Sequence, residues 1–204
     1  PRERGGGADL PNPVDNMANL RRMEEGWRLA GLGETERAIE HLAAMVAESP
    51  GMTEAWVKLA ELQADAGRDD EAAVSYRQVL GRTPVPQPDL AVALGLVELR
   101  RGRLDEAETL GRGAVASLPV KAHVLLARLA VARSDFATAE REATAAAGEG
   151  DPAALLVLAE VKARAGRPVE ALADVDRAAA RAKGLRLEPL WNLEWVRGDT
   201  LARA

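Results

Sequence analysis

Residues 53–84 read TEAWVKLAELQADAGRDDEAAVSYRQVLGRTP and contain two amphipathic helical patterns separated by a glycine. In the first pattern, Trp56, Leu59 and Gln63 recur at intervals of three and four, which places them on one face of a helix. Gly67 follows, at the position after a helix end where glycine is favoured. Acidic residues then open a second apolar-periodic segment, as expected for the first turn of a helix. The stretch therefore predicts a helix–turn–helix.

The same pattern recurs along the chain with a period near 34 residues. Each turn, a Gly-X or once a Ser-Asp dipeptide, is followed five residues later by an alanine: Ala38, Ala72, Ala107, Ala139 and Ala171. A period of this size is typical of stacked helix–turn–helix repeats. The predicted helix pairs are 18–31 with 34–48, 53–66 with 69–82, 88–101 with 104–117, 120–133 with 136–147, and 152–165 with 168–183.

These residues resemble the tetratricopeptide repeat family. The second repeat matches the family motif most fully, through Trp56, Leu59, Ala60, Ala72, Tyr76 and Pro84. The resemblance extends over residues 18–183 and implies an all-α, right-handed α-solenoid of about five helix pairs plus a C-terminal helix. The implied repeats are 18–50, 53–84, 88–119, 120–151 and 152–183.

The two ends of the chain differ from the repeats. Residues 1–17 contain three consecutive glycines and three prolines, which favours a flexible leader or linker. Residues 187–204 form an amphipathic segment that could be the first helix of a sixth repeat. Its Trp191 and Trp195 lie four apart on one face and are a second candidate contact, because exposed tryptophan is a common binding hot spot. Packing within the chain is the alternative for this pair.

The composition excludes several classes of function. The 204 residues include 27 basic and 32 acidic ones, no cysteine, and no basic cluster of the kind that contacts nucleic acid. No apolar stretch is long enough to span a membrane. We therefore expect no nucleic-acid partner and a soluble protein, cytoplasmic or periplasmic, of unassigned compartment. Absence of cysteine also excludes disulfides and thiolate chemistry.

Residues suited to catalysis do not gather in the sequence. His41 and His123 lie far apart on different repeats, and no His, Asp or Glu cluster has the spacing of metal ligands. The acidic pairs, such as Asp69-Asp70, stand in first helical turns, where the helix dipole accounts for them. We expect a protein that is not an enzyme and that has no metal or cofactor.

A row of residues on the first helices is the candidate binding site. In the family, these helices line a concave groove, and the resemblance places two groove positions of each repeat here. The row comprises Met23, Trp27, Val57, Glu61, Val92, Leu96, Val124, Arg128, Leu156 and Glu160. Aliphatic residues flanked by mixed charge could take the apolar side chains of a peptide. Packing between helices is the alternative for the same residues.

Two glycines lie inside one predicted helix. Gly111 and Gly113 would each cost about 1 kcal/mol relative to alanine in a helix interior. Either a neighbouring helix approaches closely there, or the array is soft at this point. The close approach is the expected explanation.

The sequence as a whole predicts a non-catalytic scaffold that binds a protein or peptide in its groove. Two alternatives remain open. One is an accessory domain of a larger enzyme, since the segments 8–15 and 197–204 around the repeats are similar to repeat regions that follow the catalytic domain in some bacterial sulfatase-like hydrolases. The other is a self-associating structural module, a homo-oligomer formed through the terminal helix.

Overall fold

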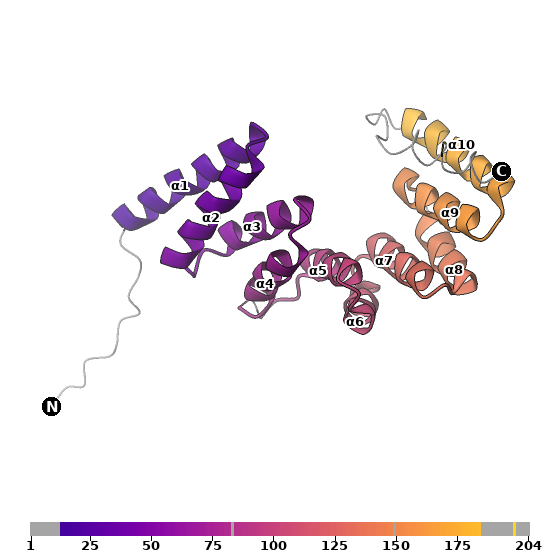
Figure 1. Ribbon diagram of the computed structural model, residues 1–204, viewed down its shortest axis with the longest axis horizontal. Helices are drawn as coiled ribbons and strands as arrows, with labels where there is room; N and C mark the ends of the chain where they lie inside the picture. The colour runs from indigo at the N-terminus through magenta and orange to yellow at the C-terminus, as the bar shows by residue number, and fades with distance from the viewer. Residues whose placement is uncertain (1–12, 83, 149, 185–197, 199–204) are drawn as a thin grey trace. The chain divides into compact units, whose positions relative to one another are not determined.

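The computed structural model describes residues 13–82, 84–148, 150–184 and 198, and these residues form α-helices joined by short turns (Figure 1). The chain divides into an N-terminal unit, residues 1–82, and a C-terminal unit, residues 83–204. The N-terminal unit contains α1 (Pro13–Gly31), α2 (Thr35–Glu48), α3 (Thr53–Asp65) and α4 (Asp69–Leu80). The C-terminal unit contains α5 (Pro88–Arg100), α6 (Leu104–Ala114), α7 (Pro119–Ala132), α8 (Phe136–Ala147), α9 (Pro152–Arg164) and α10 (Pro168–Gly184).

Helices α1, α2 and α3 of the N-terminal unit share an apolar cluster. Helix α1 packs on α2, α2 on α3, and α3 on α4. Leu42 and Met45 of α2 are fully buried at the centre, against Met23 of α1 and Leu59 of α3. Burying a side chain of this size contributes about 1.5–3 kcal/mol, so α2 supplies much of the packing energy of this unit.

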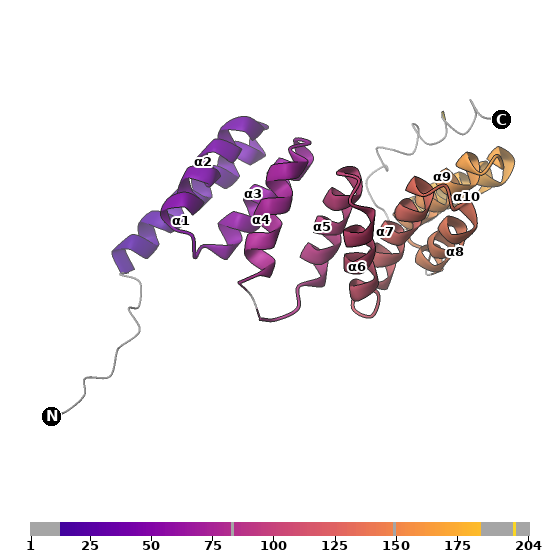
Figure 2. The same cartoon turned by 60° about the horizontal axis from the view of Figure 1, so that its bottom comes forward.

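The C-terminal unit has an alanine-rich core. Helix α7 contacts its pair partner α8 and also α5 and α9, so the first helices of three repeats are neighbours (Figure 2). Ala139, Ala143 and Ala146 of α8 have no exposed surface and pack in the same cluster as Ala159 of α9. Small side chains let the helix axes approach closely, and alanine loses no side-chain entropy when it is buried.

The turn within each pair confirms the predicted helix ends. In the turn between α3 and α4, Gly67 has φ +73°. Its N–H donates to the carbonyl of Ala64 at 3.2 Å, and the Arg68 N–H donates to Gln63 at 2.8 Å. This pair of bonds is a Schellman motif, which satisfies carbonyls at the end of a helix. Ser134, at φ +59°, forms the same turn between α7 and α8 without the freedom of glycine.

The glycines of the C-terminal unit differ in what surrounds them. A Cβ on Gly111 would lie 3.1 Å from Leu126, which confirms the expected close approach by a neighbouring helix. A Cβ on Gly95 of α5 would lie only 2.5 Å from Leu125 of α7. By contrast, nothing lies within 4 Å of a Cβ on Gly113, so close packing does not explain this glycine.

The helix boundaries depart from the predicted ones by three residues or more at two places. Helix α1 begins at Pro13, five residues before the expected start at 18. Proline is compatible with a first helical turn, because its missing N–H would have no helical partner there. Helix α6 ends at Ala114 instead of 117, since residues 115–118 form the turn into α7. Residues 1–12 of the leader and most of the predicted terminal helix lie outside the described residues.

Two repeats bury a polar pair between their helices. Counted from the start of the repeat, these are the eleventh and twenty-third residues. In α3–α4, the Ser75 hydroxyl donates to Gln63 Oε1 at 2.7 Å. In α9–α10, Lys162 Nζ donates to Asp174 Oδ2 at 2.6 Å. Polar side chains placed in such an interior are tolerated when they are hydrogen-bonded, and each pair meets that condition.

Arginines in the turns link consecutive repeats within each unit. Arg68 pairs with Glu36 of α2 in the N-terminal unit. In the C-terminal unit, Arg133 reaches Glu108 of α6 at 2.5 Å and Arg167 reaches Glu140 of α8 at 2.6 Å. The hydrogen bonds from these arginines lower the pKa of Glu108 and of Glu140. Because the pairs are partly exposed, each contributes only modestly to the stability of the fold.

Candidate interaction surfaces

The N-terminal unit carries four residues of the predicted groove row. Met23 of α1 is 4% exposed and belongs to the apolar cluster, whereas Trp27 is 43% exposed. Val57 of α3 is half-buried, and Glu61 is exposed and lies 3.4 Å from Lys58. The packing role left open by the sequence fits Met23. Trp27, in contrast, presents an indole to the surface of α1.

The surroundings of Trp27 combine apolar surface with neutralised charge. Leu20, seven residues earlier and therefore on the same face of α1, is also exposed. Next to Trp27, Arg28 donates two hydrogen bonds of 2.7 Å to Glu25, and they lower the pKa of that carboxyl. This face of α1 thus presents two large apolar side chains. The charges beside them, on Arg28 and Glu25, neutralise each other.

The C-terminal unit carries the other six residues of the row on three neighbouring helices. Val92 of α5 and Leu156 of α9 are buried, and Val124 of α7 is half-buried. The second position of each helix is more accessible: Leu96 and Glu160 are half-buried, and Arg128 is exposed. Glu160 is held by Arg164 at 2.9 Å. The inner residues therefore pack the helices, while Leu96 and Arg128 reach the surface.

The remaining candidates of the sequence are placed as follows. Trp191 and Trp195 lie outside the described residues. His41 Nε2 lies 2.8 Å from the carbonyl of Arg22, and His123 Nδ1 lies 2.8 Å from Glu142. Each histidine thus joins the two helices of its own pair. Among the residues that the structure describes, no three His, Asp or Glu side chains gather as potential metal ligands.

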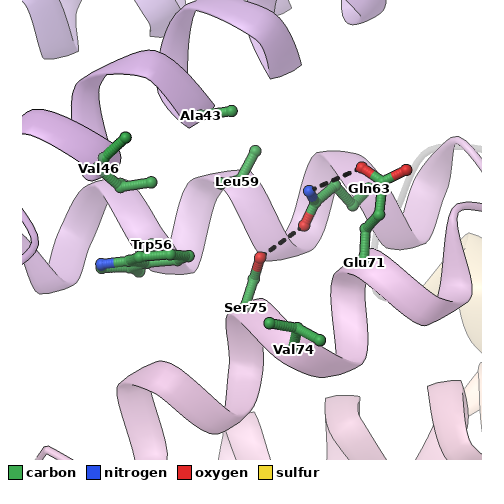
Figure 3. Close-up of a pocket in the computed structure, with 9 residues that line it drawn as sticks. Ala43, Val46, Trp56, Leu59, Gln63, Glu71, Val74 and Ser75 are labelled. Atoms are coloured by element: carbon green, nitrogen blue, oxygen red, sulfur yellow. Dashed lines mark hydrogen bonds between the residues drawn. The ribbon is translucent and has the colours of Figure 1, made fainter.

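The structure also contains a cleft that the sequence did not predict (Figure 3). It has a volume of about 300 Å³ and lies among α2, α3 and α4 of the N-terminal unit. The lining residues are Ala43, Val46, Ala47, Trp56, Leu59, Gln63, Glu71, Val74 and Ser75. Its lining comes from two repeats, with Ala43, Val46 and Ala47 from the first and Val74 from the second. A sequence pattern within a single repeat does not contain that information.

The cleft has a network of polar side chains at one end and the Trp56 indole at the other. Gln63, which accepts from Ser75, also donates to Glu71 at 3.2 Å (Figure 3). The guanidinium of Arg82, which does not line the cleft, lies 5.5 Å from the centre of the Trp56 ring, which is a cation–π distance. Trp56 Nε1 donates to the Pro50 carbonyl at 2.9 Å, so the indole is fixed in its plane.

Comparison with known families agrees with this architecture. A tetratricopeptide repeat model matches residues 70–122 and 124–185, and a second such model matches residues 29–93. The chain belongs to the tetratricopeptide repeat family. The predicted fold class, an all-α solenoid of such helix pairs, is therefore confirmed. Membership of this family indicates a protein–protein interaction scaffold.

Several solved tetratricopeptide repeat structures are similar to this chain. A thermophilic one from Thermus thermophilus has 22% identity and a TM-score of 0.71, covering 90% of this chain and 99% of that one. PilW, described as a type IV pilus biogenesis factor, has 20% identity and a TM-score of 0.69, covering 95% and 88%. YrrB, described as having an unusual peptide-binding site, has 17% identity and a TM-score of 0.56, covering 85% and 88%.

No protein of curated function matches the sequence significantly. In the described part of the chain, every helix is too short or too polar to cross a lipid bilayer.

Proposed function

We propose that this tetratricopeptide repeat protein binds a segment of a partner protein along the accessible part of the groove row. The observation that carries the proposal is Trp27, whose indole is 43% exposed on α1 instead of joining the adjacent core. Tryptophan is enriched among the residues that dominate binding energy at protein interfaces. Leu20, exposed on the same helix face, widens this apolar contact.

The buried residues of the groove row support the proposal, because they fix the helices on which the exposed residues of the row lie. Met23 holds α1 in the core beside Trp27, and Val92 holds α5 beside Leu96. A surface fixed in this way loses little conformational freedom when a partner binds, which favours affinity. In the C-terminal unit, Leu96 and Arg128 offer one apolar and one cationic contact on neighbouring helices.

A site-specific crosslinking experiment tests the proposal. A photo-crosslinking amino acid is placed at Trp27 of the full chain in its own cells, and at Val169 as the control. Val169 is 77% exposed on α10 and lies outside the groove row. We expect a distinct protein to be captured from position 27 and not from position 169. Binding of that purified protein should weaken about 30-fold or more in Trp27→Ala, the loss typical of a hot-spot residue.

Two results would contradict the proposal. One is the same set of captured proteins from positions 27 and 169, which would indicate random encounters. The other is unchanged affinity of the captured protein for Trp27→Ala when circular dichroism shows that the variant is folded.

A further inference from the structure

The cleft among α2, α3 and α4 is a surface distinct from the groove row. Both use α3, whose residues advance by about 100° each around the helix axis. Leu59 and Gln63 line the cleft, whereas Val57 and Glu61 of the groove row lie on another face of the same helix. A ligand could therefore occupy the cleft without contacting the groove row of this unit.

The cleft offers apolar surface that the chain itself leaves uncovered. Val74 is 54% exposed and lines the cleft together with Ala43 and Val46. Leu59 lies between Ala43 of α2 and Ser75 of α4 (Figure 3). A volume of about 300 Å³ lies at the lower end of the range for ligand pockets. Such a space suits a single large apolar side chain.

Acidic side chains surround one end of the cleft. Glu71 lines it, and Arg68 pairs with both Glu71 and Glu36. Glu40 lies one helical turn before Ala43 on the same face of α2, is exposed, and has no partner among the described residues. Three carboxylates against one guanidinium leave this end with an excess of negative charge.

The charge of the whole unit has the same sign. Residues 1–82 contain 15 acidic and 10 basic residues, whereas residues 83–204 contain 17 of each. The entire net charge of −5 thus belongs to the unit that holds the cleft. A field of this sign attracts cationic partners and raises their association rate.

We propose that the cleft binds a basic peptide segment, which inserts one large apolar side chain between Ala43 and Val74 and places a lysine or arginine beside Glu40 and Glu71. The apolar side chain supplies burial and the cation supplies orientation. The acidic residues gather at the Gln63 end and Trp56 lies at the other, so the charge of the cleft gives the bound segment a direction. This inference concerns a surface apart from Trp27 and does not depend on the proposed function.

A pair of matched synthetic peptides tests the inference on the full chain. The first is a short fluorescein-labelled peptide with leucines at helical spacing and lysines at the other positions, and its twin has glutamate in place of every lysine. Binding is measured by fluorescence anisotropy, and the contact is located from NMR shifts of the Trp56 indole N–H and the Val74 methyls. We expect the lysine peptide to move both signals and to bind about tenfold or more tightly than its twin.

Four variants locate the contact. Val74→Arg should weaken the lysine peptide about tenfold or more, through lost apolar burial and charge repulsion. Val169→Arg adds the same charge at another exposed valine, in the C-terminal unit, and should have little effect. Glu40→Lys should weaken binding several-fold without disturbing any internal bond. Trp27→Ala should leave the affinity unchanged, which separates this test from that of the proposed function.

The following outcomes would overturn the inference. The lysine peptide could bind with the Trp56 and Val74 signals unmoved, which would indicate general attraction to an acidic surface. The two peptides could move the signals equally, which would indicate an apolar site without charge preference, such as one for a small apolar molecule. Equal weakening by Val74→Arg and Val169→Arg would likewise exclude the cleft.

Discussion

The α3–α4 pair and the α9–α10 pair solve the same structural problem with different chemistry. Both place polar side chains twelve residues apart in the interior of the pair. In α3–α4 the pair is Gln63 with Ser75, which is neutral. In α9–α10 it is Lys162 with Asp174, which is ionic, and Arg177 also donates to Asp174 at 2.7 Å.

The difference shows that the fold accepts a polar bridge between the two helices at this place and does not specify its chemistry. The groups of a neutral hydrogen bond carry a small desolvation cost when they are buried. The bond also contributes little to the net free energy of folding. A buried ion pair carries a large desolvation cost, which the attraction between the two charges offsets. Removal of one partner therefore leaves a buried charge whose desolvation cost is no longer offset. The two pairs should therefore respond very differently to equivalent substitutions.

The largest effect is expected for Asp174→Ala. The carboxylate is 3% exposed, and its removal leaves the 16%-exposed Lys162 ammonium without its partner. We expect a loss of about 3–5 kcal/mol in the free energy of unfolding, measured by urea denaturation. The double variant Lys162→Met with Asp174→Leu should recover most of that loss. A loss below about 1 kcal/mol for Asp174→Ala would show that the ion pair is not important for the α9–α10 pair.

A smaller loss is expected for Ser75→Ala in α3–α4. Gln63 is 5% exposed, so its Oε1 would lose its donor in a place that water hardly reaches. We expect about 1–2 kcal/mol of destabilisation by the same measurement. Ser117→Ala, at an exposed serine in the turn after α6, is the control and should change little. A destabilisation by Ser75→Ala as large as that by Asp174→Ala would contradict the expected difference between the neutral and the ionic pair.

A gain in stability is expected at the turn that both pairs share. Gly67 in α3–α4 and Gly166 in α9–α10 have positive φ, and Ser134 takes their place in α7–α8. A side chain in this left-handed conformation is strained, so Ser134→Gly should stabilise the protein by roughly 0.5–1 kcal/mol. Gly67→Ala should cost about 1 kcal/mol. Destabilisation by Ser134→Gly would show that the serine hydroxyl contributes more than the strain removes.

The smallest effect concerns acid stability. Hydrogen bonding from Arg167 lowers the pKa of Glu140 below its ordinary value of 4.5. This stabilisation is present above pH 4.5 and is lost as the pH falls through the lower folded-state pKa. Glu140→Gln should therefore flatten the acid limb of a stability–pH curve and leave the Gln63–Ser75 pair unaffected. Identical limbs for the variant and the parent chain would contradict the assignment.

The sequence predicts the helix pairs well because the decisive residues act locally. Gly67 and Ser134 end their helices through bonds within a few residues, and Ala72 or Ala139 are small at the closest contact of a pair. The start of α1 was not predicted, because proline-rich segments are compatible with a first helical turn as well as with a linker. Gly113 also shows the limit of local patterns, since its sequence context resembles that of Gly111 but its surroundings do not.

The candidate surfaces are less predictable because they depend on contacts between repeats. The family resemblance marked Met23 and Trp27 alike as groove residues, yet one is buried and the other exposed. The cleft depends on Ala43 and Val74, which belong to different repeats and have no sequence relation to each other. Only the packing of α2 on α3, and of α3 on α4, brings them to one opening.

Helix α7 contacts α5 and α9, which are not its neighbours in the chain. Every other extensive contact among the described helices joins helices that are consecutive in the chain. Proteins with mainly local contacts fold rapidly, because little loop-closure entropy is lost before native contacts form. In a repeat array folding can begin at any repeat and spread to its neighbours. During synthesis on the ribosome, the first repeats can therefore become structured before translation reaches the last ones.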